Sequence, residues 1–192
     1  KYKRWYEAQG LDFTHTCLCM ESDISELKFK PSKFPLGFKI ESLAEISRNE
    51  IHKCFFETFK EGSDRFILSL DGEQREDFFD MFFDKTTLNE ASYALLKEGK
   101  LIGFLVAREA GEAIELGPLG IHPEFQGKGL GKALLGLSLT KIIEQGHKIS
   151  YLEVDSENHV AYELYRKYGF DTISKKVGYS WMAPKERIRR KI

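Results

Sequence analysis

A strand-like run, a glycine-rich turn and an apolar helical run follow one another between residues 113 and 146, and this order most restricts the fold. The turn, "HPEFQGKGLGK", places Gly127, Gly129 and Gly131 beside two lysines. Backbone N–H groups at a helix N-terminus have no partners within the helix, and glycines let a bulky anion come close to them. The sequence therefore predicts that this turn binds phosphate groups, most specifically a pyrophosphate.

The patterns along the rest of the chain predict an α+β fold. Strands are expected at residues 36–43, 91–98, 101–110, 113–121, 148–156, 170–174 and 178–183, and helices at 47–62, 73–85, 129–146 and 158–169. Short turns between the strands from 91 to 121 predict an antiparallel meander, and the last two strands predict a closing hairpin. Gly117 and Pro118 interrupt a strand, which favours a bulge at that point.

Composition excludes several classes of protein. A chain of 192 residues with 42% hydrophobic content can bury a core within one domain, and a net charge of -1 gives no reason to expect a nucleic-acid partner. No apolar run approaches the roughly 18 residues of a membrane span, and no signal-peptide pattern stands at the N-terminus. Three cysteines, an odd number, predict a reducing, cytoplasmic location. His15, Cys17 and Cys19 alternate on a predicted strand with a spacing too long for one zinc ion, so we expect no metal.

Two common nucleotide-binding patterns do not fit the turn. The P-loop pattern needs wider glycine spacing and a hydroxyl where Ala133 stands, and the dinucleotide pattern lacks its third glycine. The spacing that is present, Gln126-x-x-Gly129-x-Gly131 after "HPEF", resembles the acyl-CoA signature of the GCN5-related N-acetyltransferase (GNAT) superfamily.

A second stretch resembles the other half of that family's pattern. It is a strand followed by Asn158, Ala161, Leu164, Tyr165, Gly169 and Phe170. The resemblance covers about residues 36–183, and it implies a mixed, mostly antiparallel sheet flanked by helices, with central strands splayed around an acyl-CoA site. Residues 1–35 would form an N-terminal extension and residues 184–192 a basic tail.

The resemblance implies transfer of the acetyl group of acetyl-CoA to a primary amine of a small molecule or peptide by direct attack. The alternative is a non-catalytic acyl-CoA-binding regulatory module of the same fold. The implied cofactor-binding residues are Leu119, Gly120, Ile121, Gln126, Gly127, Lys128, Gly129, Leu130, Gly131, Lys132, Asn158 and Tyr165. Backbone N–H groups near residues 119–121 would stabilise the oxyanion, and Tyr165 would protonate the leaving thiolate.

Three alternatives remain for the general base: Glu153, Glu115, or no single residue. Glu153 precedes Asn158 by five residues, a placement that resembles the catalytic glutamate of the ribosomal-protein acetyltransferases, and we prefer it. Glu115 lies on the strand predicted to splay. If Leu152 and Val154 pack into the core, Glu153 faces the cleft, where partly dry surroundings would raise its pKa.

The N-terminus shows a short internal repeat. The spacing of Tyr6, Gly10, Leu11 and Asp12 matches that of Tyr165, Gly169, Phe170 and Asp171. This predicts that the chain opens with the last helix turn and strands of a preceding similar unit, as in a tandem protein or a swapped strand; a chance match is the alternative. As partners we expect acetyl-CoA and an amine, neither nucleic acid nor membrane, and we leave a homodimer open.

Overall fold

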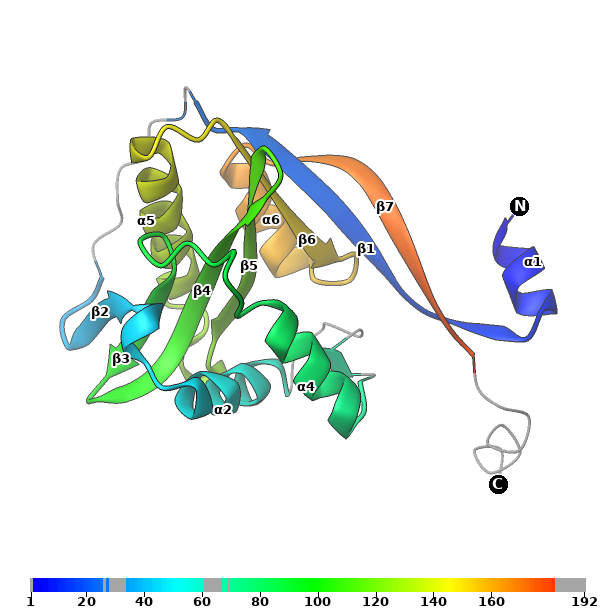
Figure 1. Cartoon of the computed structure of the whole chain (residues 1–192), viewed down its shortest axis with the longest axis horizontal. Helices are drawn as coiled ribbons and strands as arrows, with labels where there is room; N and C mark the ends of the chain where they lie inside the picture. The colour runs from blue at the N-terminus through cyan, green and yellow to red at the C-terminus, as the bar shows by residue number, and fades with distance from the viewer. Residues whose placement is uncertain (1, 26, 28–33, 61–66, 69, 182–192) are drawn as a thin grey trace.

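The computed structural model describes residues 2–25, 27, 34–60, 67–68 and 70–181 (Figure 1). In chain order the elements are α1 (Tyr2–Ala8), β1 (Leu11–Asp23), β2 (Phe38–Ser42), the 3-10 turn η1 (Leu43–Glu45), α2 (Arg48–Phe59), α4 (Gly72–Met81), β3 (Tyr93–Lys97), β4 (Lys100–Ala110), β5 (Ala113–Ile121), the 3-10 turn η2 (Pro123–Phe125), α5 (Leu130–Glu144), β6 (Ile149–Asp155), α6 (His159–Lys167) and β7 (Asp171–Trp181). Most predicted elements are found within a few residues of their expected bounds.

One seven-stranded sheet organises the domain, with the order β2-β3-β4-β5-β6-β1-β7. All neighbours are antiparallel except β5 and β6, which are parallel because the chain crosses over through α5. The predicted α+β class, with a mostly antiparallel sheet and flanking helices, is confirmed.

Helices cover both faces of the sheet. On one face α5 and α6 enclose the larger core, in which Leu134, Leu139 and Phe170 are fully buried. On the other face α2 and α4 pack against β4 through a smaller core built around Phe55 and Phe79. The phenylalanine-rich stripes of the two early helices therefore form core, as their helical spacing indicates.

The predicted closing hairpin is wrong. Residues 171–181 form a single strand, β7, and its partner is β1 from the other end of the chain. Gly178 lies within this strand, and a Cβ atom there would lie 2.3 Å from the Cε1 atom of His15. Glycine permits a close approach between strands rather than a turn.

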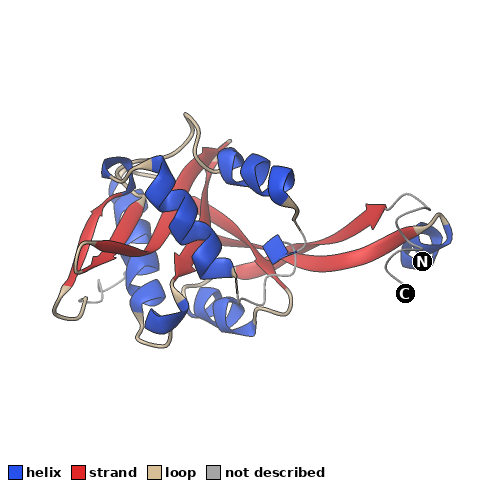
Figure 2. Ribbon diagram, turned by 90° about the horizontal axis from the view of Figure 1, so that it is seen from below, coloured by secondary structure: helices blue, strands red, loops and turns tan. Residues whose placement is uncertain are grey.

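The strands β1 and β7 extend beyond the rest of the sheet. β6 pairs with β1 only over residues 17–23, so the remaining length of the two strands forms a two-stranded ribbon that leaves the domain and carries α1 at its end (Figure 2). In the part of the chain that is described, no helix is long and apolar enough to cross a membrane.

Candidate functional site

The site begins where β5 and β6 part. Their parallel pairing consists of two residue pairs, Ile114 with Ser150 and Glu115 with Tyr151. Immediately after these pairs β5 bulges, since Gly117 and Pro118 together lie opposite a single residue of β4. The splay that the sequence predicts between these two strands is therefore present.

The N-terminus of α5 lies beside the end of β5. Gly129 is the N-cap residue with φ 75°, and the first helical hydrogen bond runs from the Ala133 N–H to the Gly129 carbonyl at 3.0 Å. The amides of Leu130, Gly131 and Lys132 precede that bond. They are the donors that an α-helix leaves for another partner, and they lie at the positive end of the helix dipole.

Side chains of the turn support it from within. The Gln126 Nε2 donates to the Ile121 carbonyl at 2.8 Å and ties the turn to the end of β5. The Lys128 Nζ donates to the Glu124 carbonyl at 3.0 Å and lies 4.9 Å from the centre of the Phe125 ring. Gln126 therefore shapes the turn through the protein's own backbone, whereas Lys128 keeps a positive charge at its surface.

The glycines leave space next to these amides. A Cβ atom built on Gly127 or Gly129 would meet no atom within 4 Å, and one on Gly131 would lie 3.7 Å from the Ile121 Cγ1. This short distance places Gly131 of α5 beside Leu119 and Ile121 at the end of β5. Open space beside free helix amides and two lysines fits a ligand with phosphate groups.

Helix α6 borders the same region. The Asn158 Oδ1 caps it by accepting from the Ala161 N–H at 3.1 Å, and Tyr165 lies in the larger core with 8% of its surface exposed. An open groove of about 500 Å³ separates the start of α5 from α6, and its lining is Lys132, His159, Val160, Glu163, Leu164 and Lys167. The predicted residues Lys132, Asn158 and Tyr165 are thus placed around one end of the sheet.

Glu115 belongs to a buried network that the sequence did not reveal. The Arg108 Nε donates to its carboxylate, and the Arg108 Nη1 donates to the Met81 carbonyl at 2.7 Å, which links β4 to the end of α4. Burial, and then the charge and the hydrogen bond of Glu115, raise the pKa of Tyr151. The available signal was an arginine in an otherwise apolar run, "LIGFLVAREA", and its partner is fixed by register: Arg108 lies directly opposite Glu115.

Glu153 faces away from the larger core, as alternation predicts, because Leu152 and Val154 are buried in it. The expected dry surroundings are not found. Glu153 occupies an exposed position, pairs with the Lys176 Nζ, and accepts a hydrogen bond from the Cys17 Sγ at 3.7 Å. The hydrogen bond from the Lys176 ammonium to Glu153 is the main cause that raises the pKa of Lys176.

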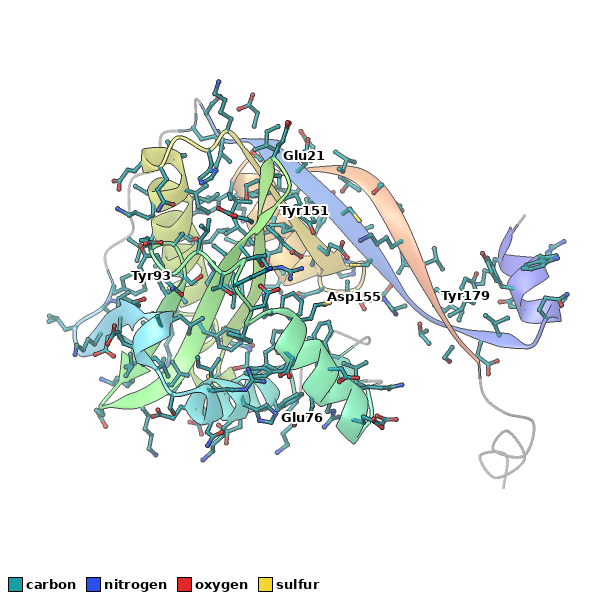
Figure 3. The ribbon with its side chains drawn as sticks, viewed as in Figure 1. Glu21, Glu76, Tyr93, Tyr151, Asp155 and Tyr179 are labelled. Atoms are coloured by element: carbon teal, nitrogen blue, oxygen red, sulfur yellow. The ribbon has the colours of Figure 1, made fainter. Side chains whose placement is uncertain are left out.

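The sheet face opposite the larger core is rich in carboxylates. Tyr151 and Asp155 lie along β6, and Glu21 on the neighbouring strand β1 lies directly opposite Tyr151 (Figure 3). The side chains of Glu115 and Glu153 lie on the same face as those of Glu21 and Asp155, and we call it the carboxylate face. Two cations, Arg108 and Lys176, contact it. The described residues contain no group of three His, Cys, Asp or Glu side chains placed to hold a metal ion.

Residues 48–170 match the family described as Acetyltransferase (GNAT) family. The mycothiol acetyltransferase of Saccharomonospora viridis is 28% identical over 190 residues, which are 92% of this chain and 60% of that protein. The [Ribosomal protein bS18]-alanine N-acetyltransferase of Haemophilus influenzae is 32% identical over 85 residues, which are 44% of this chain and 58% of that protein.

Solved structures share the fold. The crystal structure of a GCN5-related N-acetyltransferase from Sphaerobacter thermophilus superposes with a TM-score of 0.69 at 18% identity, covering 93% of this chain and 55% of that one. The chain thus spans about 60% of the length of the curated relatives above and about half of this solved structure.

Proposed function

Because the chain belongs to the acetyltransferase (GNAT) family, as its two motifs predicted, we propose that it transfers the acetyl group of acetyl-CoA to a primary amine of a small molecule or peptide. One observation carries this proposal: the free amides at the N-terminus of α5 lie beside the point where β5 and β6 part. The first feature suits a pyrophosphate and the second leaves a strand edge for an extended chain.

The chain's own groups would hold acetyl-CoA between the N-terminus of α5 and the gap between β5 and β6. The amides of residues 130–132 and the Lys128 ammonium bind the pyrophosphate. The backbone of residues 119–121, freed from β6 by the splay, pairs with the extended arm of the ligand as an added strand would. Acetyl-CoA supplies an activated thioester, so the protein has to bring an amine to the carbonyl carbon and manage protons.

Glu153 is the group that we assign to accept the proton of the incoming ammonium. It lies beyond the last paired residues of β5 and β6, on the side of the gap, and its partner Lys176 is exposed. Exposed ion pairs of this kind contribute only about 0–1 kcal/mol, so an amine can displace the lysine. Glu115 is instead a positioning residue, because it is buried, Arg108 pairs with its carboxylate, and, after burial, its charge raises the pKa of Tyr151.

The remaining steps use the backbone and Tyr165. When the amine attacks, the N–H groups near residues 119–121 would stabilise the oxyanion. When the carbon–sulfur bond breaks, the Tyr165 hydroxyl gives its proton to the thiolate. The first proton of the ammonium stays on Glu153, and the second proton, which the nitrogen loses on becoming an amide, restores the Tyr165 hydroxyl. The products are then the amide, the CoA thiol and a protonated Glu153. Tyr165 is largely shielded from water, which limits competing proton exchange.

The carboxylate face supports an acceptor that carries more than one positive charge or polar donor. On this face Glu153 is exposed, and its ion pair with Lys176 is one that a cationic acceptor can replace. Within the described residues the three cysteines form no disulfide, and a reducing, cytoplasmic location remains our expectation.

The proposal is tested with a panel of diamines, amino sugars, amino acid amides and N-terminal peptides, by following release of the CoA thiol. We expect turnover with cationic acceptors and loss of that turnover in Glu153→Gln. Tight acetyl-CoA binding without turnover of any amine would instead support the non-catalytic regulatory module.

A further inference from the structure

The ribbon formed by β1 and β7 carries the same sequence of elements at both of its ends. Helix α6 ends at Lys167, Gly169 follows with φ 81°, and β7 begins. Helix α1 ends at Ala8, Gly10 follows with φ 83°, and β1 begins. The two helices therefore stand at opposite ends of one ribbon, each leading into one of its strands (Figure 1).

The pairing of the two strands has two-fold symmetry. Gly10 and Gly169 are 159 residues apart, and adding this number to a residue of the first segment gives its counterpart in the second. Eight of the residue pairs then form four sets of counterparts: Asp12 with Ser180 and Glu21 with Asp171, Phe13 with Tyr179 and Met20 with Thr172, His15 with Gly178 and Cys19 with Ser174, Thr16 with Val177 and Leu18 with Lys175. The pair of Cys17 and Lys176 is its own counterpart and marks the centre.

The irregularities of the ribbon follow the same symmetry. The register shifts once past Thr14 on β1 and once past Ile173 on β7, and these two residues are again 159 apart. An extra residue in a ladder bends and twists the strand that carries it. Both strands are therefore bent at corresponding positions, and the ribbon consists of two equivalent halves.

The near half is part of the domain. Residues 17–23 of β1 fill the place between β6 and β7, and the side chains on their inner face reach the larger core. Met20 has no exposed surface, and Tyr165 on the adjoining helix has 8%.

The far half presents the same positions without cover. The counterpart of Tyr165 is Tyr6, with 36% of its surface exposed, and the counterpart of Leu18 is Val177, with 50%. Tyr179, the counterpart of Met20, stacks on Tyr6 with ring centres 4.7 Å apart. Trp5 packs edge-on against Tyr6 and is 57% exposed. This set of aromatic residues resembles one side of a core whose other side is outside the described residues.

We propose that the far half of the ribbon completes the sheet of a second unit of the same fold. By the symmetry, a central strand of that unit pairs with the outer edge of residues 176–181, as β6 pairs with β1. Helix α1 takes the place of α6 in it. Because α1 is covalently part of this chain, the rest of the unit would be joined on the N-terminal side of α1.

A second copy of this chain does not fit the far half in this way. The strand that the symmetry requires is an equivalent of β6 with a free edge, and in each copy β6 carries its own β1 along Ile149–Asp155. The occupant has to be a unit that ends in α1 and lacks a strand of its own at that edge.

Amide hydrogen exchange tests the proposal. Two polypeptides are compared. One is the full translation product, which includes every residue on the N-terminal side of α1, and the other is the 192-residue chain. We expect residues 176–181 to exchange at least about 100-fold more slowly in the longer polypeptide, with no change at residues 171–174. Equal exchange in both would overturn the proposal. Protection that rises with the concentration of the 192-residue chain would also overturn it, in favour of a second copy.

A pair of substitutions on β7 separates docking from general damage to the strand. Val177→Lys lies in the far half and Ile173→Lys in the near half, and the wild-type side chains are 50% and 59% exposed. In the longer polypeptide, Val177→Lys should remove the added protection and lower the melting temperature by at least about 3 °C, while Ile173→Lys leaves both unchanged. Equal effects of the two variants would contradict the assigned halves.

Discussion

Two regions meet where β5 and β6 part, and they work by different means. The turn before α5 offers backbone amides, whose donor capacity does not change with pH and whose positions are set by glycine conformations. The carboxylate face offers side chains, whose charges titrate and whose partners are other charged groups. The comparison indicates that binding of acetyl-CoA and proton transfer are separable, and that each can be removed without the other.

The largest effect should follow from closing the turn. Gly131→Val places branched carbons beside the free amides, and we expect acetyl-CoA affinity to fall by about 10³-fold, as measured by calorimetry. The protein should still fold, because a Cβ at Gly131 makes only ordinary contacts with Ile121. The matched control is Gly72→Val, which also lies in the first turn of a helix, with open space around its Cβ.

A second pair controls for backbone strain. Gly129 and Gly146 both have a φ in the left-handed region, 75° and 87°, and both have open space where a Cβ would stand. Gly129→Val and Gly146→Val should therefore destabilise the fold to a similar extent, while only the first weakens acetyl-CoA binding. Unchanged affinity in Gly129→Val and Gly131→Val would remove the phosphate-binding role of the turn.

Tyr165→Phe should have the next largest effect and should fall on turnover alone. Removing the hydroxyl leaves the buried ring in the core, so we expect kcat to drop by about 10²-fold with little change in acetyl-CoA affinity. Steady-state kinetics combined with calorimetry separates the two quantities. A variant as fast as wild type on its best acceptor would show that Tyr165 serves only in packing.

The two carboxylates should differ from each other. Glu153→Gln should lower kcat/KM by about 30-fold and remove the acidic limb of the pH–rate profile, because the proposed base is lost. Glu115→Gln should keep that limb and instead lower thermal stability, because Arg108 loses its buried partner. If Glu153→Gln keeps the limb and Glu115→Gln loses it, the two roles are reversed.

The smallest effect should come from the lysine beside Glu153. A group whose folded-state pKa is raised stabilises the fold below its unfolded pKa, and that contribution is lost as the pH rises through the folded value. Its bond to Glu153 raises the pKa of Lys176 above 10.5, so Lys176→Gln should lower the free energy of unfolding at pH 8 by no more than about 1 kcal/mol and by less above pH 11. The neighbouring Lys175→Gln is the control, and urea unfolding is the measurement. An equal loss in both variants would contradict this contribution.

The same comparison explains what the sequence could predict. The turn was predictable because its function is local: the spacing of Gln126, Gly129 and Gly131 already fixes where amides and space occur. The direction of Glu153 followed from simple alternation with Leu152 and Val154.

What the sequence missed depends on contacts between distant segments. Arg108 and Tyr151 join Glu115 only through the register of three strands, which no local pattern contains. The closing hairpin was predicted because residues 170–174 and 178–183 form two strand-like runs separated by three residues. The actual partner, β1, lies more than a hundred residues away in the chain, and it prevents the two runs from folding onto each other.

The outer edge of β7 is protected along only half of its length. Strand edges exposed to solvent are commonly blunted by lysines and bulges, which discourage the strands of other molecules from adding to them. The near half of β7 has both, with the bulge at Ile173 and the charge of Lys175, and Lys176 adds a charge at the centre of the ribbon. Residues 177–181, "VGYSW", carry no charge at all. Left uncovered, this short segment would be the point at which the protein aggregates, and its solubility would depend on whatever lies against it.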